Sequence, residues 1–160
     1  MNLVITPYDP ANIPQEEIIP LPDPRFYKAV GGDEGFRSLI NEFYDKIVES
    51  DIAFFFPQEE EEIERIKEHN GKYFAEIAGG PKRYSEEMGH VDQIKMHKPF
   101  SINDKHRTEW LGTWREVLLE YASNVDSNLV ESYFKFLDEY SKLLVNKELK
   151  ARAFEDLAKV

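Results

Sequence analysis

The apolar residues of this chain recur at intervals of three and four residues, the spacing that places side chains on one face of an α-helix. No segment shows the strict alternation of apolar and polar residues that a half-buried strand requires. The pattern therefore predicts an all-α fold. The residues of the first long stripe are Phe36, Leu39, Ile40, Phe43 and Ile47.

Capping and helix-breaking residues divide these stripes into segments. A short helical turn is expected at residues 26–30, followed by a first long helix that ends near Ser50. Asp33 suits the N-cap of that helix, because its carboxylate can accept hydrogen bonds from the free N–H groups of the first turn. An apolar corner at residues 54–57 follows, and its proline blocks further helix.

Three more long helices are predicted along the rest of the chain. The first begins in the acidic run at residues 58–62, since acidic side chains favour a helix N-terminus, and it ends at Gly79-Gly80. Residues 82–91 are expected to form an irregular loop. Asn103 and Asp126 are expected to cap the last two helices.

The two ends of the chain differ from its middle. Six of the nine prolines precede Arg25, and proline excludes a regular helix or a central strand there. Residues 1–24 still carry several apolar side chains, so we expect an extended arm on the surface of the domain, with a disordered leader as the alternative. The domain is expected at residues 25–146, and residues 147–160 are expected to form a charged, helical C-terminal tail.

Composition limits the kinds of partner and chemistry. The 31 acidic residues exceed the 20 Lys and Arg, and the net charge of −11 argues against binding to nucleic acid or to an anionic membrane surface. The chain has no cysteine, which excludes disulfides, thiolate catalysis and cysteine-ligated metal sites. No signal peptide is visible, and no apolar run approaches the roughly 18 residues of a membrane span, so we expect a cytoplasmic protein.

The residues around His97 are the clearest chemical signal. Taken alone, the segment Met96–Phe100 would make His97 an ordinary surface or core histidine. However, Tyr44 precedes an aromatic corner, the next helix mixes polar and apolar residues on one face, and Trp110 follows His97 by 13 residues. A flat apolar cofactor held by one imidazole needs such a wall, and haem is that cofactor. The chain has no HExxH pair, glycine-rich phosphate loop or GxSxG motif.

These residues and their spacing resemble the truncated haemoglobins, or 2/2 globins, and among them group II. The resemblance covers about residues 26–145 and leaves out both ends of the chain. The matching motifs are Phe26-Tyr27 with Gly31-Gly32, Phe43-Tyr44, Phe56-Pro57, Gly79-Gly80-Pro81 with Tyr84, Gly89-His90, His97 with Pro99-Phe100, and Trp110-Leu111.

The resemblance implies a shortened globin fold whose helices pack two on two around haem b. His97 matches the proximal iron ligand of the family. Tyr44 matches the distal tyrosine that hydrogen-bonds the ligand, and Trp110 matches the tryptophan that walls the haem and often donates its indole N–H. The other residues expected to contact haem are Phe56, Ile66, Asn70, Tyr73, Lys95, Met96 and Phe100.

The chain departs from the family pattern near the expected pocket. Val91 replaces the proline usual after Gly-His. Met96 replaces the basic residue common before the proximal histidine, so Lys95 becomes a candidate partner of the haem propionates. Asn70 stands where an apolar residue is frequent, and a more polar pocket is therefore expected.

The three remaining histidines have less specific expectations. His69 is expected to face solvent or a propionate, with a role as a sixth iron ligand as the alternative. His90 is expected in a loop, and His106 is expected to be exposed on its helix.

The function expected from this resemblance is a haem protein that binds O₂, NO or other diatomic ligands. One alternative is a haem-dependent redox enzyme, such as an NO dioxygenase or a peroxidase-like enzyme, for which a reductase is a candidate partner. Another alternative is a haem-free globin-like interaction module. The sequence leaves open whether the protein is an enzyme, which ligand is physiological and which oligomer it forms.

Overall fold

The computed structural model describes residues 1–16 and 19–147. All regular secondary structure within these residues is helical, as expected for an all-α fold. The elements are α1 (Phe26–Ala29), α2 (Gly32–Ile47), the 3₁₀ turn η2 (Ala53–Phe55), α3 (Glu60–Ile77), α4 (Arg83–Met88), α5 (Gln93–His97), α6 (Asp104–Tyr121) and α7 (Ser127–Leu144).

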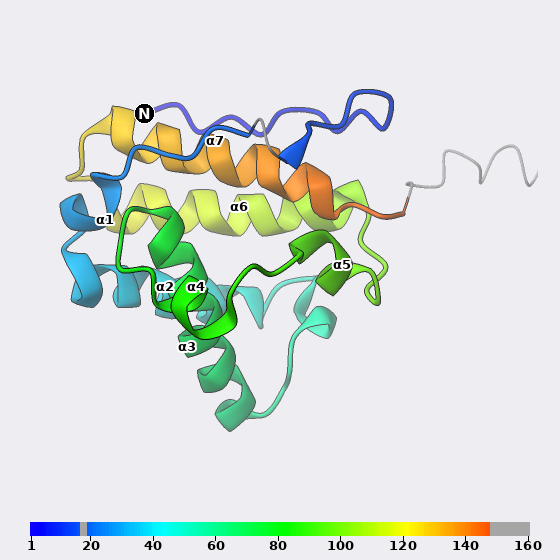
Figure 1. The fold of residues 1–160 in the computed structure, drawn as a ribbon, viewed down its shortest axis with the longest axis horizontal. Coiled ribbons are helices and arrows are strands. Elements are labelled where there is room, and N and C mark those ends of the chain that lie inside the picture. The colour runs from blue at the N-terminus through cyan, green and yellow to red at the C-terminus, as the bar shows by residue number, and fades with distance from the viewer. Residues whose placement is uncertain (17–18, 148–160) are drawn as a thin grey trace, which may run out of the picture.

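The four long helices form the body of the molecule. Helix α2 packs against both α3 and α6, and α6 packs against α7, which lies beside it (Figure 1). The short helix α4 packs against α3, and α5 contacts α7 near its C-terminal end. This arrangement leaves space near α5 that side chains from several helices surround.

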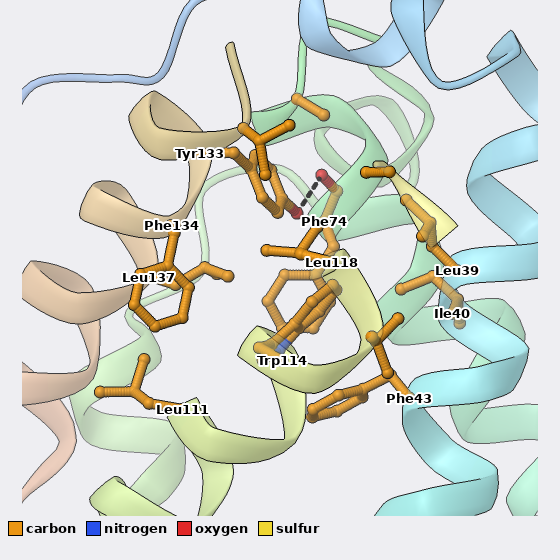
Figure 2. Close-up of a cluster of buried hydrophobic side chains, with 14 of the residues drawn as sticks. Leu39, Ile40, Phe43, Phe74, Leu111, Trp114, Leu118, Tyr133, Phe134 and Leu137 are labelled. Carbon is orange, nitrogen blue, oxygen red and sulfur yellow. Dashed lines mark hydrogen bonds between the residues drawn. The ribbon is translucent and has the colours of Figure 1, made fainter. Parts of the chain in front are cut away.

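Aromatic residues fill the centre of the core, where α2, α3, α6 and α7 meet (Figure 2). Trp114 is fully buried and stacks on Phe43 with ring centroids 4.5 Å apart. The hydroxyl of Tyr133 donates a hydrogen bond of 3.1 Å to the carbonyl oxygen of Phe74, which ties α7 to α3. Burial of each large side chain of this kind contributes about 1.5–3 kcal/mol to folding.

The end of α3 requires a glycine. Gly79 has a φ of +102°, and a Cβ at this position would lie 1.9 Å from the carbonyl oxygen of Pro24. The close approach brings the start of α1 onto the end of α3, where the Tyr27 N–H donates to the Ala78 carbonyl oxygen at 3.0 Å. Gly79 therefore ends the helix and also lets another segment of the chain pack against it.

Two of the three predicted helix caps are confirmed. The Asn103 side chain accepts a hydrogen bond from the His106 N–H at 2.9 Å, and His106 Nδ1 accepts one from the Asn103 N–H at 3.1 Å. Asp126 accepts from the Asn128 N–H at 2.9 Å. The cap at Asp33 is wrong, because α2 already begins at Gly32 and the Asp33 carboxylate is paired with Arg83 at 3.0 Å.

The loop expected at residues 82–91 is also wrong, because α4 occupies most of it. Contacts with α3 hold this short helix in place. The Ser85 N–H donates to the Glu76 carboxylate at 3.0 Å, and the Lys72 ammonium lies 2.9 Å from the Glu87 carboxylate. A helix of this length has little stability of its own, so its sequence carries no strong helical signal.

The proline-rich arm runs along α7 (Figure 1). Leu3 is buried in the core cluster. The Thr6 N–H donates to Asp138 at 3.0 Å, and Arg107 donates to the Thr6 carbonyl oxygen at 3.1 Å. Arg107 and Asp138 are themselves a buried ion pair with 2.6 Å between nitrogen and oxygen.

Most of the predicted C-terminal tail cannot be compared with the structure, since residues 148–160 lie outside the described residues. Residue 147 is not helical. Within the described ranges, none of the helices has the length and apolar content needed to cross a membrane.

Candidate functional site

A cavity of about 260 Å³ lies among α3, α5, α6 and α7. Its wall is mostly apolar and aromatic, as the sequence predicts for a flat cofactor. Eight of the ten predicted site residues line it, namely Tyr44, Phe56, Ile66, Asn70, Tyr73, His97, Phe100 and Trp110.

His97 occupies the last turn of α5 and is half-buried. Its Nδ1 lies 2.6 Å from the carbonyl oxygen of Gln93, one helical turn earlier. A carbonyl can only accept a hydrogen bond, so Nδ1 carries the proton and Nε2 of the neutral ring keeps its lone pair. The ring that lines the cavity is thereby fixed in the tautomer that can ligate a metal through Nε2.

The chain around α5 is held from both ends. Asp92 caps the helix by accepting from the Lys95 N–H at 3.1 Å. Beyond the helix, the Asn146 amide donates to the carbonyl oxygens of His97 at 3.3 Å and Phe100 at 2.7 Å. These contacts fix the short helix that positions the His97 ring.

Tyr44 and Asn70 form a polar pair inside the cavity. Tyr44 lies on the last turn of α2, and its hydroxyl oxygen accepts a hydrogen bond of 2.9 Å from the Asn70 amide on α3. The hydroxyl proton of Tyr44 therefore stays available for donation to another group. Burial raises the pKa of Tyr44 to about 12, and the hydrogen bond from Asn70 lowers it only in part, so the phenol is neutral at physiological pH.

Trp110 supplies a second donor to the cavity. It is half-buried on α6, with ring centroids 6.0 Å from Phe43 and 6.2 Å from Phe74. Its indole N–H can only donate, and it has no hydrogen-bond partner among the residues that the structure describes. One helical turn later, Trp114 lies in the core, where its indole N–H is also without a partner within the described part of the chain.

Two predicted haem contacts are not part of the cavity wall. Lys95 and Met96 are exposed on α5, and the Met96 side chain is 60% accessible to solvent. Neither belongs to the lining, because α5 turns His97 inward and these neighbours outward. His69 and His90 are also exposed and outside the wall.

His106 is not the exposed helix residue expected from the sequence. It is half-buried and lines the cavity, with its ring centroid 4.9 Å from that of Phe55. Its hydrogen bonds with Asn103 fold the imidazole back over the start of α6. Burial, together with the neighbouring charge of Lys105, lowers the pKa of His106, which favours the neutral ring.

Several other lining residues were not among the expected site residues. Tyr84 stands in one of the motifs shared with the truncated haemoglobins, and Gln93 could have been found from its position one helical turn before His97, whereas the others depend on how distant helices meet. The additional wall residues include Phe74, Tyr84, Gln93, Ile102, Arg107 and Tyr140. The cavity thus combines an imidazole with a free lone pair, a phenol and an indole that can donate, and a broad aromatic wall.

The family model of bacterial-like globins matches residues 25–145 of this chain. One relative is the group 2 truncated hemoglobin YjbI of Bacillus subtilis, which is 25% identical over 122 residues. The matched region spans 76% of this chain and 88% of that protein.

Solved structures share the fold. Hell's gate globin IV, in its phosphate-bound form, has a TM-score of 0.75 at 21% identity, with 83% of each chain covered. The group II truncated hemoglobin of Bacillus anthracis has a TM-score of 0.70 at 23% identity, with 78% of this chain and 93% of that one covered. The hemoglobin of Chloroflexus aurantiacus has a TM-score of 0.68 at 26% identity, with 76% and 98% covered.

Proposed function

This chain belongs to the bacterial-like globin family, and we propose that it binds haem in the cavity beside α5, with His97 as the iron ligand. The observation that carries the proposal is the 2.6 Å contact between His97 Nδ1 and the Gln93 carbonyl oxygen. That contact orients the imidazole and leaves Nε2 as the ligating atom, in the way that haem-binding histidines are commonly held.

The residues of the cavity fit a flat, largely apolar cofactor. Phe56, Phe100 and Trp110 supply aromatic surface, and Ile66 supplies aliphatic surface on the inner face of α3. Lys95 is exposed near His97, and its ammonium group would be a candidate partner of the haem propionates. We assign haem b because the chain has no cysteine for the covalent attachment found in c-type haem.

We further propose that the pocket binds O₂ and other diatomic ligands such as NO. Bound haem supplies the iron at which such a ligand coordinates. Tyr44 and Trp110 can each donate a hydrogen bond into the cavity, and each bond stabilises a ligand with partial negative charge by roughly 1 kcal/mol, or more in a dry pocket. Asn70 holds the Tyr44 oxygen, which aims the remaining phenolic proton away from the amide.

Haem titration of the purified protein tests this assignment. The full chain should acquire the Soret band of a histidine-ligated haem, and His97→Ala should lose stable haem or show a spectrum without a proximal imidazole. His90→Ala is a matched control, because His90 is exposed and outside the cavity wall. A normal imidazole spectrum in His97→Ala would contradict the assignment of His97 as the iron ligand. Absence of a Soret band in the full chain would favour the haem-free interaction module.

Redox catalysis is the second candidate function. Two donors in one pocket favour tight retention of O₂, which suits consumption of NO or reduction of peroxide better than delivery of O₂. The O₂-bound protein should then convert added NO to nitrate stoichiometrically, with NO measured electrochemically. Simple displacement of O₂ by NO, without formation of nitrate, would contradict the redox function and leave ligand binding as the only supported function.

A further inference from the structure

An exposed cluster of aromatic rings lies beside the proposed haem pocket. The ring centroids of Phe55 and Phe100 are 6.1 Å apart, and that of Phe54 is 4.3 Å from that of Phe55. The His106 ring completes the cluster, at 5.6 Å from Phe54 and 4.9 Å from Phe55. Phe54 is 66% exposed and Phe100 is 43% exposed, so the cluster presents apolar surface to solvent. We call these four residues the aromatic face.

The aromatic face is also part of the cavity wall. Phe55, Phe100 and His106 line the cavity, whereas Phe54 lies outside the lining. A protein that covered this face would therefore be separated from the cavity by a single layer of side chains. The face thus joins the solvent side of the molecule directly to the proposed haem pocket.

Lysines without ion pairs border the aromatic face. Lys98 lies just beyond α5, and Lys105 precedes His106, on which its charge acts. Lys147 follows α7, and its backbone N–H donates to the Ile102 carbonyl oxygen at 3.0 Å. All three lysines are exposed, and none of them forms an ion pair within residues 1–16 and 19–147.

Few carboxylates offset these lysines. Residues 93–103 contain no Asp or Glu, although the whole chain has a net charge of −11. The carboxylates that flank this segment are engaged, since Asp92 caps α5 and Asp104 lies 3.1 Å from Arg107. On the other side of the face, the acidic run at residues 59–62 is outside the cavity wall. The aromatic face is therefore bordered by positive charge in a chain that is otherwise acidic.

An apolar centre with a charged border is the usual composition of a protein–protein interface. Aromatic residues and methionine are enriched at the centre of such interfaces, and polar residues form the rim. Met96, which is 60% exposed on α5, adds apolar surface close to the lysines. Opposite charges on two proteins steer their encounter, so an acidic protein complements this surface. A second copy of this chain, with a net charge of −11, would be repelled overall.

From this surface we infer that the aromatic face is the docking site of an acidic electron-transfer protein that carries a reduced flavin or iron–sulfur cluster. The inference rests on the proposed haem function, because O₂ binds ferrous iron and the conversion of bound O₂ and NO to nitrate leaves the iron ferric. The partner would supply one electron. Its cofactor is oxidised by one electron, the ferric iron is reduced to ferrous iron, and no bond forms or breaks.

Flavodoxin and plant-type ferredoxin are the probes for this site, since both are small acidic proteins that donate single electrons, from FMN and from a [2Fe–2S] cluster. The test variant is Lys98→Glu with Lys105→Glu, and the matched control is Lys28→Glu with Lys82→Glu. Each change of lysine to glutamate lowers the charge by 2, so both double variants go from −11 to −15. All four lysines are exposed and outside the cavity wall.

Stopped-flow mixing measures the electron transfer. Each reduced probe should convert the ferric Soret band of the haem-loaded protein to the ferrous one, at a second-order rate that falls as salt is added. At low salt, Lys98→Glu with Lys105→Glu should slow this rate by about tenfold or more, within the range that steering provides. The control double variant should slow it far less, because its charges lie away from the face.

A separate variant tests the apolar centre of the face. Phe54→Ser removes exposed aromatic surface without touching the cavity lining. It should slow reduction at high salt as well as at low salt, because salt does not screen apolar contacts. Leu119→Ser is its control, since Leu119 is 48% exposed on α6 and outside the cavity wall, and it should reduce at the wild-type rate.

NMR provides a readout that does not depend on haem. When oxidised flavodoxin is added to the full chain at low salt, the backbone amide signals of residues 98–106 should shift in the wild type and in the control double variant. They should stay unchanged in Lys98→Glu with Lys105→Glu.

Three outcomes would overturn the inference. Absence of these shifts with both probes would exclude the docking site, even if haem binding itself failed, and equal slowing in the two double variants would exclude this location for it. Shifts without any reduction of the loaded protein would exclude the electron-transfer role. Tighter binding to vesicles of anionic phospholipid than to either probe would assign the face to a membrane surface instead.

Discussion

Tyr44 keeps its proton because burial opposes ionisation of its phenol, so its hydroxyl can donate a hydrogen bond in the pocket while its oxygen accepts one from Asn70. The Asn70 amide occupies the Tyr44 oxygen at 2.9 Å. Removal of the Tyr44 hydroxyl would therefore free the Asn70 amide, which could donate to a ligand in its place. The distal donors are thus coupled, and their contributions to ligand retention should not add.

Variants of the two donors test this coupling. Tyr44→Phe and Trp110→Phe should each speed O₂ release, by up to tens-fold if a desolvated donor is worth about 1–3 kcal/mol. The double variant should lose less than the sum of the two effects, because Asn70 or a water partly replaces the lost donors. O₂ dissociation rates of the wild type, both single variants and the double variant measure this. Unchanged rates in both single variants would show that these side chains do not touch the ligand.

Titration of two pocket tyrosines contributes to the alkaline limit of stability, together with that of Tyr133 and Tyr140, whose pKa values burial also raises. Burial raises the pKa of both Tyr44 and Tyr73 to about 12, above the value near 10 of an unfolded chain. Since the folded-state pKa is the higher one, the neutral phenols contribute their full stability below pH 10, and that stability is lost as pH rises towards 12.

Urea unfolding across this pH range measures the effect. The free energy of unfolding should fall between pH 10 and 12, and Tyr44→Phe should remove part of the decline. A decline of the same depth in Tyr44→Phe and in the wild type would contradict the assignment to Tyr44.

At the scale of single elements, the start of α6 links helix stability to the pocket. Asn103 caps the helix through His106, and His106 in turn lines the cavity. Asp126 caps α7 in a similar way, but it is outside the cavity wall.

Removal of each cap separates these two roles. Asn103→Ala and Asp126→Ala should each lower the free energy of unfolding by about 1 kcal/mol. Only Asn103→Ala should also shift the haem absorption spectrum, because only that cap positions a cavity residue. Denaturant unfolding and the Soret position of both variants would test this, and an equal spectral shift in Asp126→Ala would contradict it.

At the scale of the whole molecule, the N-terminal arm contacts the buried ion pair of Arg107 and Asp138 through the backbone of Thr6. Arg107 also lines the haem pocket, so the arm and the pocket share a wall residue. Removing one partner of a buried ion pair is costly, whereas exposing an intact pair to water is milder.

Deletion of residues 1–24 should therefore lower the melting temperature while haem remains bound. The deletion removes the buried Leu3 side chain and the two backbone bonds of Thr6. Thr6→Val is a graded control, since it keeps those backbone bonds and should cost less. Thermal unfolding of the two proteins with haem absorbance measures both effects, and an unchanged melting curve in the deletion would favour a disordered leader.

The sequence by itself determined the long helices, because the apolar spacing that defines a helical face is a local property of the chain. Stop signals such as Gly79-Gly80 and caps such as Asn103 are local as well. They predicted the C-terminal end of α3 and the start of α6. The motif around His97 and the order of Tyr44 and Trp110 were also readable, since they depend on residue identity and spacing.

Only the tertiary structure decided how these elements meet. Helix α4 depends on its contacts with α3. Asp33 does not cap α2 but forms an ion pair with Arg83, which lies on a distant segment. The inward turn of His106 and the hydrogen bond between Asn70 and Tyr44 likewise require side chains far apart in sequence. Such contacts depend on packing between helices, which a one-dimensional pattern does not specify.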